Sequence, residues 1–198
     1  MLTRTRMTSR RLGADERSRI ARDLREDLGA RLLNQLSRTE NPASAAETRA
    51  LLTELRSLLD VLDPRRFMLG ECVDEWHAAL ADLCADQQIK LQWDAPARWT
   101  PLPLSPVQRC NPLLVLREFM RNAALHSQPS FIEFRLRKRG NTMTIRGVHD
   151  GLIEPPQAWQ AARGLRMAGL RAQDLQGRLA WSTPSPGTLQ LDLRFPLP

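Results

Sequence analysis

Apolar residues recur at helical spacing in two stretches of the first third of the chain. Between Leu12 and Leu36 the large aliphatic residues fall three or four positions apart, which is the period of one helix face. A second stripe of leucines runs from Leu51 to Leu62. An Asn-Pro step and an Asp-Pro step follow these stripes, and the residue before a proline avoids the helical region. The pattern predicts an antiparallel helical hairpin over residues 12–66.

The predicted hairpin has more apolar surface than it can bury alone. Two copies joined in a four-helix bundle are the commonest way to cover both leucine stripes. We therefore expect a homodimer formed through residues 12–66. Residues 1–11 carry four arginines and no acid, and we interpret them as a solvated basic tail.

From residue 67 onward the pattern alternates between helices and strands. Helical spacing predicts helices at 71–86, at 113–125 with Pro112 near its first turn, and at 165–175 with Gly177 as its stop. Alternation of apolar and polar residues predicts strands at 89–93, 131–137, 142–148, 178–183 and 188–195. Residues 94–111 read as irregular and 151–163 as a loop or lid. The predicted class is α+β, with helices on one face of a mixed sheet.

Composition narrows the class of protein without naming a function. The chain has 198 residues, of which 42% are hydrophobic and 26% charged, the balance of a soluble globular protein. Its net charge of +7 is spread over both halves, which disfavours a surface dedicated to nucleic acid. Three cysteines without metal-binding spacing indicate buried thiols in a reducing compartment. No apolar stretch approaches the roughly eighteen residues of a membrane span, so we expect a cytoplasmic protein.

Five segments lie at residues 16–32, 117–127, 149–151, 164–165 and 186–188. In this order they resemble motifs of bacterial sensor histidine kinases of the nitrate-sensor class. Residues Glu16–Leu32 resemble the dimerisation helix, whose pattern is E-R-x-R-I-A-R-E-L-H-D-x-L-G-Q-x-L, and Arg117–Ser127 resemble the N-box of the ATP-binding domain. The remaining three matches are His149-Asp150-Gly151 at the D-x-G motif, Gly164-Leu165 at the second glycine box, and Pro186-Gly187-Thr188 at the closing G-T. The resemblance runs from about residue 12 to the last residue.

This resemblance implies a fold and a set of site residues. It implies a dimerisation hairpin at 12–66 followed by a Bergerat-type ATP-binding sandwich at 67–198. Asn122 would ligate Mg²⁺, and Glu118 would support catalysis. The adenine-binding acid has two candidates, because strand alternation places His149 there whereas a one-residue bulge would restore Asp150. The nucleotide-binding positions implied by the family are Asn122, His126, His149, Asp150, Gly151, Gly164, Leu165, Gly187 and Thr188.

The departures from the family pattern carry as much information as the matches. Arg25 stands where the family has its phosphoacceptor histidine. A guanidinium stays protonated and has no free lone pair, so it cannot attack a phosphoryl group. Ala30 replaces the glutamine used for phosphatase activity, and Ala162 replaces the first glycine of the second glycine box. A β-carbon obstructs the close approach of backbone N–H groups to phosphate, so we expect binding of ATP and Mg²⁺ to be weak or absent.

Three hypotheses of different classes follow. The first is a degenerate histidine kinase, or pseudokinase, in two-component signalling, which binds a response regulator or another histidine kinase without autophosphorylation. The second is an ATP-binding enzyme that phosphorylates a partner protein. The third, a basic nucleic-acid-binding dimer, depends on net charge alone.

Overall fold

The computed structural model describes residues 67–151 and 163–198. The chain divides into two compact units, Met1–Arg65 and Arg66–Pro198, and the second is described here. The predicted hairpin, its dimer seam and Arg25 lie outside the described residues. The predicted domain boundaries stay a prediction.

A five-stranded mixed sheet forms one layer of the second unit. Its order is β2-β4-β5-β7-β6, with β2 parallel to β4 and every other neighbour antiparallel. The strands are β2 (Lys90–Asp94), β4 (Phe131–Arg139), β5 (Thr142–Asp150), β6 (Arg178–Ser185) and β7 (Thr188–Pro196). A separate two-stranded pair, β1 (Phe67–Met68) with β3 (Pro103–Leu104), was not predicted from the sequence.

Alternation along the strands decides which face is buried. In β5 and β7 every second residue is buried, and the residues between them are partly or fully exposed. The buried set lies against the helices and forms the core with them. The fully enclosed members of the sheet include Ile132, Phe134, Leu136, Met143, Ile145, Leu191 and Leu193.

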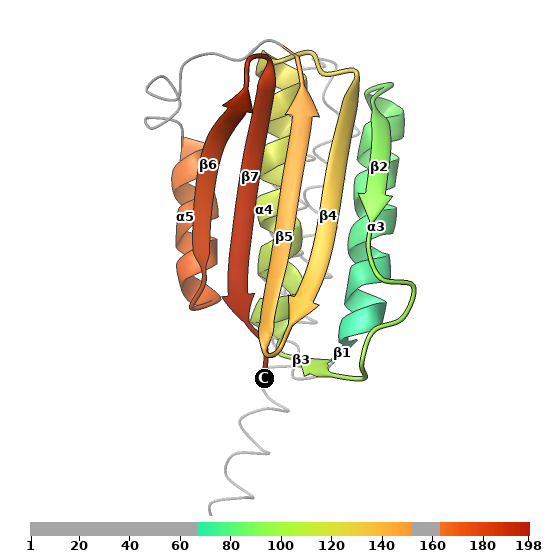
Figure 1. The fold of residues 1–198 in the computed structure, drawn as a ribbon, viewed down its shortest axis with the longest axis vertical. Coiled ribbons are helices and arrows are strands. Elements are labelled where there is room, and N and C mark those ends of the chain that lie inside the picture. Colours follow the sequence, from blue (N-terminus) through green and yellow to red (C-terminus); the bar gives the residue numbers. More distant parts are fainter. Residues whose placement is uncertain (1–66, 152–162) are drawn as a thin grey trace, which may run out of the picture. The chain divides into compact units, whose positions relative to one another are not determined.

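Three helices form the second layer, on one face of the sheet (Figure 1). They are α3 (Leu69–Asp86), α4 (Pro106–His126) and α5 (Arg163–Asp174). Helix α3 packs next to β2, and α5 packs next to β6 and β7. The α+β class and the helices on one face of a mixed sheet are confirmed. Among the described residues, no helix has the length and apolar character needed to cross a membrane.

Helix α4 begins earlier than predicted. Ser105 caps its start, accepting a hydrogen bond from Gln108 N at 3.2 Å, while Gln108 Oε1 accepts one from Ser105 N at 3.1 Å. Pro106 occupies the first turn, where a missing N–H is tolerated. Pro112 therefore lies inside the helix, and the prediction that it stands near the first turn was wrong. The capping box Ser-Pro-Val-Gln is the signal that was missed.

Helix α5 ends at Asp174, one residue before the predicted end, and Gly177 follows it closely as predicted. The residue in the left-handed region is Gln176, with φ 54°, and not Gly177. The Gly177 N–H donates to Ala172 O at 2.8 Å. A β-carbon at Gly177 would meet the backbone carbonyl of Arg194. Gly177 is therefore required by the close approach of α5 to β7 rather than by its own φ angle.

The described cysteines behave as core residues. Cys72, Cys84 and Cys110 are buried and form no disulfide. Burial raises the pKa of the Cys72 thiol to about 12 and that of Cys84 to about 11. Both thiols are therefore protonated and unreactive near neutral pH, as expected from their spacing.

Candidate functional site

Helix α4 places three of the predicted site residues on one side. Glu118, Asn122 and His126 are four positions apart, so their side chains follow one line along the helix. Their exposure increases toward the end of the helix: Glu118 is 12% exposed, Asn122 is partly buried and His126 is exposed. Phe119 and Ala123, on the neighbouring side, are buried against the sheet. Packing of α4 therefore fixes the line of polar residues at the border of the core.

Both oxygens of the Glu118 carboxylate are bound by Arg121. Arg121 Nη2 donates to Oε1 at 2.6 Å, and Nε donates to Oε2 at 3.0 Å. The hydrogen bond to Glu118 raises the pKa of Arg121, so the guanidinium stays charged. A two-point pair of this kind is stronger and more directional than a single ion pair.

Gly164 allows this carboxylate to lie against the first turn of α5. A β-carbon at Gly164 would overlap the Glu118 carboxylate and would also meet Arg121 Nη2. The beginning of a helix attracts anions, because its first N–H groups lack helical partners and the dipole is positive there. In this structure the Glu118 carboxylate lies against Gly164 in this first turn, and its hydrogen bonds come from Arg121.

His149 lies on the buried face of β5. Strand β5 pairs residue by residue with β7 from Thr142 to Asp150, without a bulge, so His149 shares the face of Ile145 and Gly147. Its ring is fully buried, 5.2 Å from the ring of Phe119 between centroids. The structure thus gives the register that the sequence left open: His149 faces the helices, and Asp150 faces away.

The protonation state of His149 follows from its contacts. Nδ1 lies 2.6 Å from the backbone oxygen of Asp150, and an oxygen of this kind only accepts, so we assign the proton to Nδ1. Burial lowers the pKa of His149, against a smaller opposite effect of Asp150, so the ring is neutral near pH 7. Nε2 is then a buried acceptor, and it has no hydrogen-bond partner among the described residues. The buried Nδ2 of Asn122 lacks one as well.

Asp150 is committed to the start of β4. Its carboxylate accepts hydrogen bonds from Ser130 N at 2.8 Å, Ser130 Oγ at 2.5 Å and Phe131 N at 3.0 Å. Burial alone would raise the pKa of Asp150, but these hydrogen bonds lower it overall. Asp150 therefore serves as a structural acceptor that holds β4 beside β5.

The remaining predicted residues surround the same end of the domain, where β5 ends and β6 turns into β7 (Figure 1). Gly151 has φ 112°, and a β-carbon there would meet the carbonyl of Ser127 at the end of α4. Gly187 has φ 73° in the β6–β7 turn, and Thr188 Oγ1 accepts a hydrogen bond from Ser185 Oγ at 2.8 Å. Leu165 is partly buried in α5.

Two partners of the site were missed by the sequence analysis. Arg121 could have been found, because opposite charges three positions apart on a helix commonly pair. Ser130 carried no such signal, since its contact with Asp150 depends on the pairing of β4 with β5. No group of three or more metal-ligating side chains occurs in the described parts of the chain.

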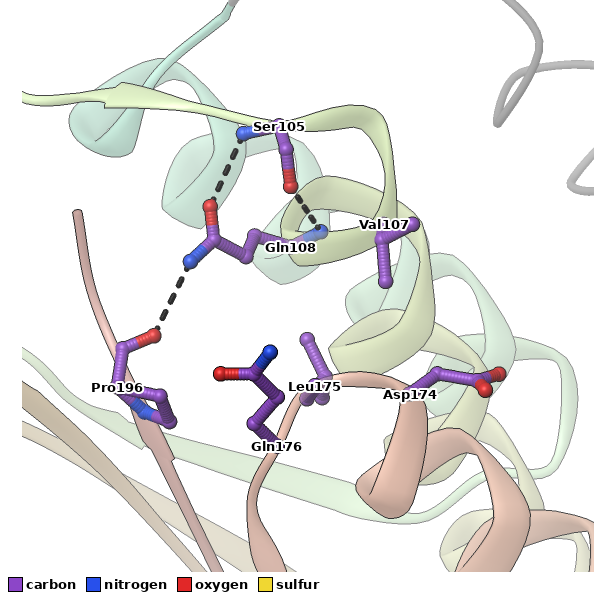
Figure 2. Close-up of a pocket in the computed structure, with 7 residues that line it drawn as sticks. All are labelled: Ser105, Val107, Gln108, Asp174, Leu175, Gln176 and Pro196. Carbon is purple, nitrogen blue, oxygen red and sulfur yellow. Dashed lines mark hydrogen bonds between the residues drawn. The ribbon is translucent and has the colours of Figure 1, made fainter.

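A hollow lies at the opposite end of α4, and none of the predicted site residues lines it. It has a volume of about 280 Å³. Figure 2 shows Gln108 bridging it, with Nε2 donating to the Pro196 carbonyl at 3.1 Å. Its lining is Ser105, Val107, Gln108, Asp174, Leu175, Gln176 and Pro196.

The site residues fit the two ends of a nucleotide unequally. His149 Nε2 can accept from an N–H donor such as the exocyclic amine of a purine, and Asn122 Nδ2 can donate. At the start of α5, however, the Glu118 carboxylate lies against Gly164, and a phosphate beside it would meet like charge. As arranged here, the Glu118 carboxylate disfavours a phosphate, and the unpaired atoms of His149 and Asn122 are enclosed by the protein.

Comparison with solved structures finds histidine kinases. The histidine kinase domain of the blue-light-activated kinase of Erythrobacter litoralis matches with a TM-score of 0.61 at 13% identity, over 87% of this chain and 96% of that one. Histidine kinase AdeS of Acinetobacter baumannii matches with a TM-score of 0.55 at 14% identity, over 87% and 94%. The ATP-binding domain of PrrB from Mycobacterium tuberculosis matches with a TM-score of 0.53 at 17% identity, over 68% and 97%.

Sequence comparison adds nothing to this likeness. No protein-family model matches the chain, and no curated protein matches it. The structural likeness, at identities of 17% and below in these three cases, concerns the arrangement of helices and strands. The chain has the fold of histidine kinase ATP-binding domains.

Proposed function

We propose that the chain is a degenerate histidine kinase of two-component signalling that acts by binding and does not autophosphorylate. Its partner is a response regulator or another histidine kinase. The helical hairpin at 12–66 dimerises, either with itself or with the similar hairpin of a related kinase. The fold of residues 67–198 and the ordered sequence motifs support the kinase-like origin.

The loss of autophosphorylation is inferred from the dimerisation helix. By resemblance, Arg25 stands at the phosphoacceptor position, outside the described residues. Arginine keeps its proton at every physiological pH, so it offers no nucleophile. Ala30 in place of the phosphatase glutamine removes the group that would orient water.

The observation that carries the proposal is the Glu118–Arg121 pair at Gly164. By resemblance, Glu118 would support catalysis and Gly164 would lie beside the phosphates. Here both Glu118 oxygens bind Arg121, at 2.6 and 3.0 Å, and the pair lies against Gly164. A triphosphate would have to displace a carboxylate from this position, which supports weak nucleotide binding.

One observation favours the second candidate, an ATP-binding enzyme that phosphorylates a partner protein. Asn122 Nδ2 and His149 Nε2 are buried without a partner among the described residues. Most buried polar groups in proteins are paired, so two unpaired groups at the predicted nucleotide site are consistent with a ligand that pairs them.

Calorimetric titration with Mg-ATP, run beside a phosphorylation assay with labelled ATP, tests the proposal. We expect a dissociation constant in the high-micromolar range or weaker, and no acid-labile phosphate on the wild-type chain. Arg25→His alone should also remain unlabelled, because the phosphate end is altered as well.

The alternative outcome is equally specific. Labelling of the wild-type chain contradicts the proposal. Binding at micromolar concentration or tighter that is lost in Asn122→Ala supports the enzyme hypothesis instead. Leu125→Ala, which truncates an exposed side chain on the same helix, serves as the matched control.

A further inference from the structure

The face of the sheet opposite the helices carries a set of arginines. Arg178 on β6 and Arg194 on β7 are direct cross-strand partners, and Arg139 lies near the end of β4 on the same face. All three side chains belong to exposed residues. We call Arg139, Arg178 and Arg194 the arginine face.

The arginine face lacks acidic partners, in contrast to other arginines on the same side of the sheet. Arg146 binds Asp192 at 3.0 Å, and Arg137 binds Asp94 at 2.6 Å. No ion pair of Arg139, Arg178 or Arg194 occurs within residues 67–151 and 163–198. Like charges directly opposite each other on neighbouring strands destabilise a sheet. The Arg178–Arg194 pair is therefore unfavourable unless an external anion neutralises it.

Helix α3 has the complementary character. It contains five acidic residues and no lysine or arginine. Glu75 binds Arg109, and Glu71 accepts from the backbone of Met68. The three others, Asp74, Asp82 and Asp86, are exposed and have no ion pair within the described ranges. We call them the acidic stripe.

The acidic stripe is accessible to long side chains from another molecule. Asp74, Ala78, Asp82 and Asp86 follow at intervals of four positions, so they form one line about 18 Å long on the helix surface. The residues between the acids include Ala78 and Ala85, both exposed. Alanine side chains leave room for arginines to reach the carboxylates on either side.

We propose that the arginine face of one copy binds the acidic stripe of a second copy. The two surfaces cannot meet within one domain, because α3 packs on the helical side of the sheet (Figure 1). The arginines alternate with the buried residues and so face the opposite side. The contact is therefore head-to-tail between molecules, and it leaves one arginine face and one acidic stripe free for further copies. It does not depend on the proposed kinase-like function.

Nucleic acid fits the arginine face less well. Asp94, Glu133 and Asp192 lie on the same side of the sheet and would repel phosphates. The cross-strand neighbours of the three arginines on that side include Thr142 and Thr144, which offer no ring for a base to stack on. Acids and arginines alternate on this side of the sheet. The separate carboxylates of the acidic stripe therefore fit the arginine face better than a continuous row of phosphates does.

The strength of the contact should depend strongly on salt. Exposed ion pairs are individually weak, and charges are screened over about 3 Å at 1 M ionic strength. At low salt we expect the full chain to form larger assemblies than it forms at about 1 M salt. The fraction of chain in these larger assemblies should rise with protein concentration.

Sedimentation velocity on the full chain tests this with paired variants. Arg178→Gln/Arg194→Gln and Asp74→Asn/Asp82→Asn should each weaken the salt-sensitive association by about tenfold or more, since each removes half of the contact. Arg98→Gln/Arg166→Gln removes the same net charge as the Arg178/Arg194 variant, from exposed residues elsewhere, and should leave the association unchanged. The immobilised arginine variant should retain the aspartate variant, and the reverse should also hold, because one variant keeps the acidic stripe and the other keeps the arginine face. Neither immobilised variant should retain further copies of itself.

Several results would overturn the proposal. One is a wild-type chain whose assembly is the same at low and high salt. Another is an equal loss in the Arg98/Arg166 control, which would indicate an effect of net charge. A third is failure of the two variants to bind each other. Loss of duplex DNA or polyglutamate binding in the arginine variant, with self-association unchanged, would assign the face to a different occupant.

Discussion

The two faces of the five-stranded sheet come from alternate residues of the same strands, yet they obey different constraints. On the inner face, Phe134, Ile145 and Leu193 are fully buried. On the outer face, Arg135 and Arg146 are cross-strand partners and remain partly exposed. A change of one residue in register would exchange the two sets. The inner face therefore specifies the register, while the outer face can vary in charge without loss of the fold.

The largest expected difference between the faces is between two adjacent residues of β7. Leu193 is fully buried and Arg194 is exposed. Leu193→Ala should lower the free energy of unfolding by about 2–5 kcal/mol, because it removes buried methyl groups and leaves a cavity. Arg194→Ala should change it by no more than about 0.5 kcal/mol.

Urea unfolding of residues 67–198 within the full chain, followed by tryptophan fluorescence, measures both values. Equal destabilisation by the two substitutions would contradict the division between the faces.

A smaller effect on the free energy of unfolding is expected from His149, whose imidazole lies on the inner face of the sheet. Burial lowers the pKa of His149 in the folded chain, whereas the unfolded chain has a pKa near 6.5. The unfolded state therefore binds the proton first as pH falls, and the free energy of unfolding should decrease from about pH 6.5 downward, until the folded-state pKa is passed. Above about pH 6.5 the imidazole is neutral in both states, and the free energy of unfolding no longer depends on its protonation.

Urea unfolding at a series of pH values tests the sign of this dependence. In His149→Leu the decrease just below about pH 6.5 should disappear. His77→Gln and His126→Gln change exposed histidines and should retain it. If all three variants follow the wild-type curve, the buried ring is not the source.

The smallest effect is expected for an ion pair on the outer face. Arg146 Nε and Asp192 Oδ1 are 3.0 Å apart, with side chains 43% and 19% exposed. A double-mutant cycle of Arg146→Ala and Asp192→Ala should give a coupling of at most about 1 kcal/mol that declines with salt. A coupling as large as the effect of Leu193→Ala would show that the outer face also determines stability.

The sequence predicted the elements where local periodicity and packing agree. The strands around Gly140 and around Gly187 were predicted within a few residues. In β5 and β7 the reason is strict alternation with one buried face, whereas β6 alternates only between exposed and partly buried residues over its first half. The start of α4 was missed because Pro112 resembles a helix start, whereas the earlier Ser105 cap already satisfies the first turn.

The candidate site was predictable as a set of positions but not as an arrangement. Spacing of four along α4 placed Glu118 and Asn122 on one side. The sequence could not decide between His149 and Asp150, because a bulge in β5 depends on its pairing with β7. The contact of Glu118 with Gly164 depends on how α4 packs against α5, which no local pattern encodes.

The ladder between β5 and β7 has a consequence for folding kinetics. The hairpins β4–β5 and β6–β7 join neighbours in the chain, whereas β5 and β7 are separated by α5 and β6. Short-range hairpins form within microseconds, while pairing across a long loop must first overcome its closure entropy. The transition state for folding should therefore contain the docking of two preformed hairpins. Destabilising substitutions in the β5–β7 ladder and in the β6–β7 turn should both slow folding, because both sets of contacts are present in that transition state.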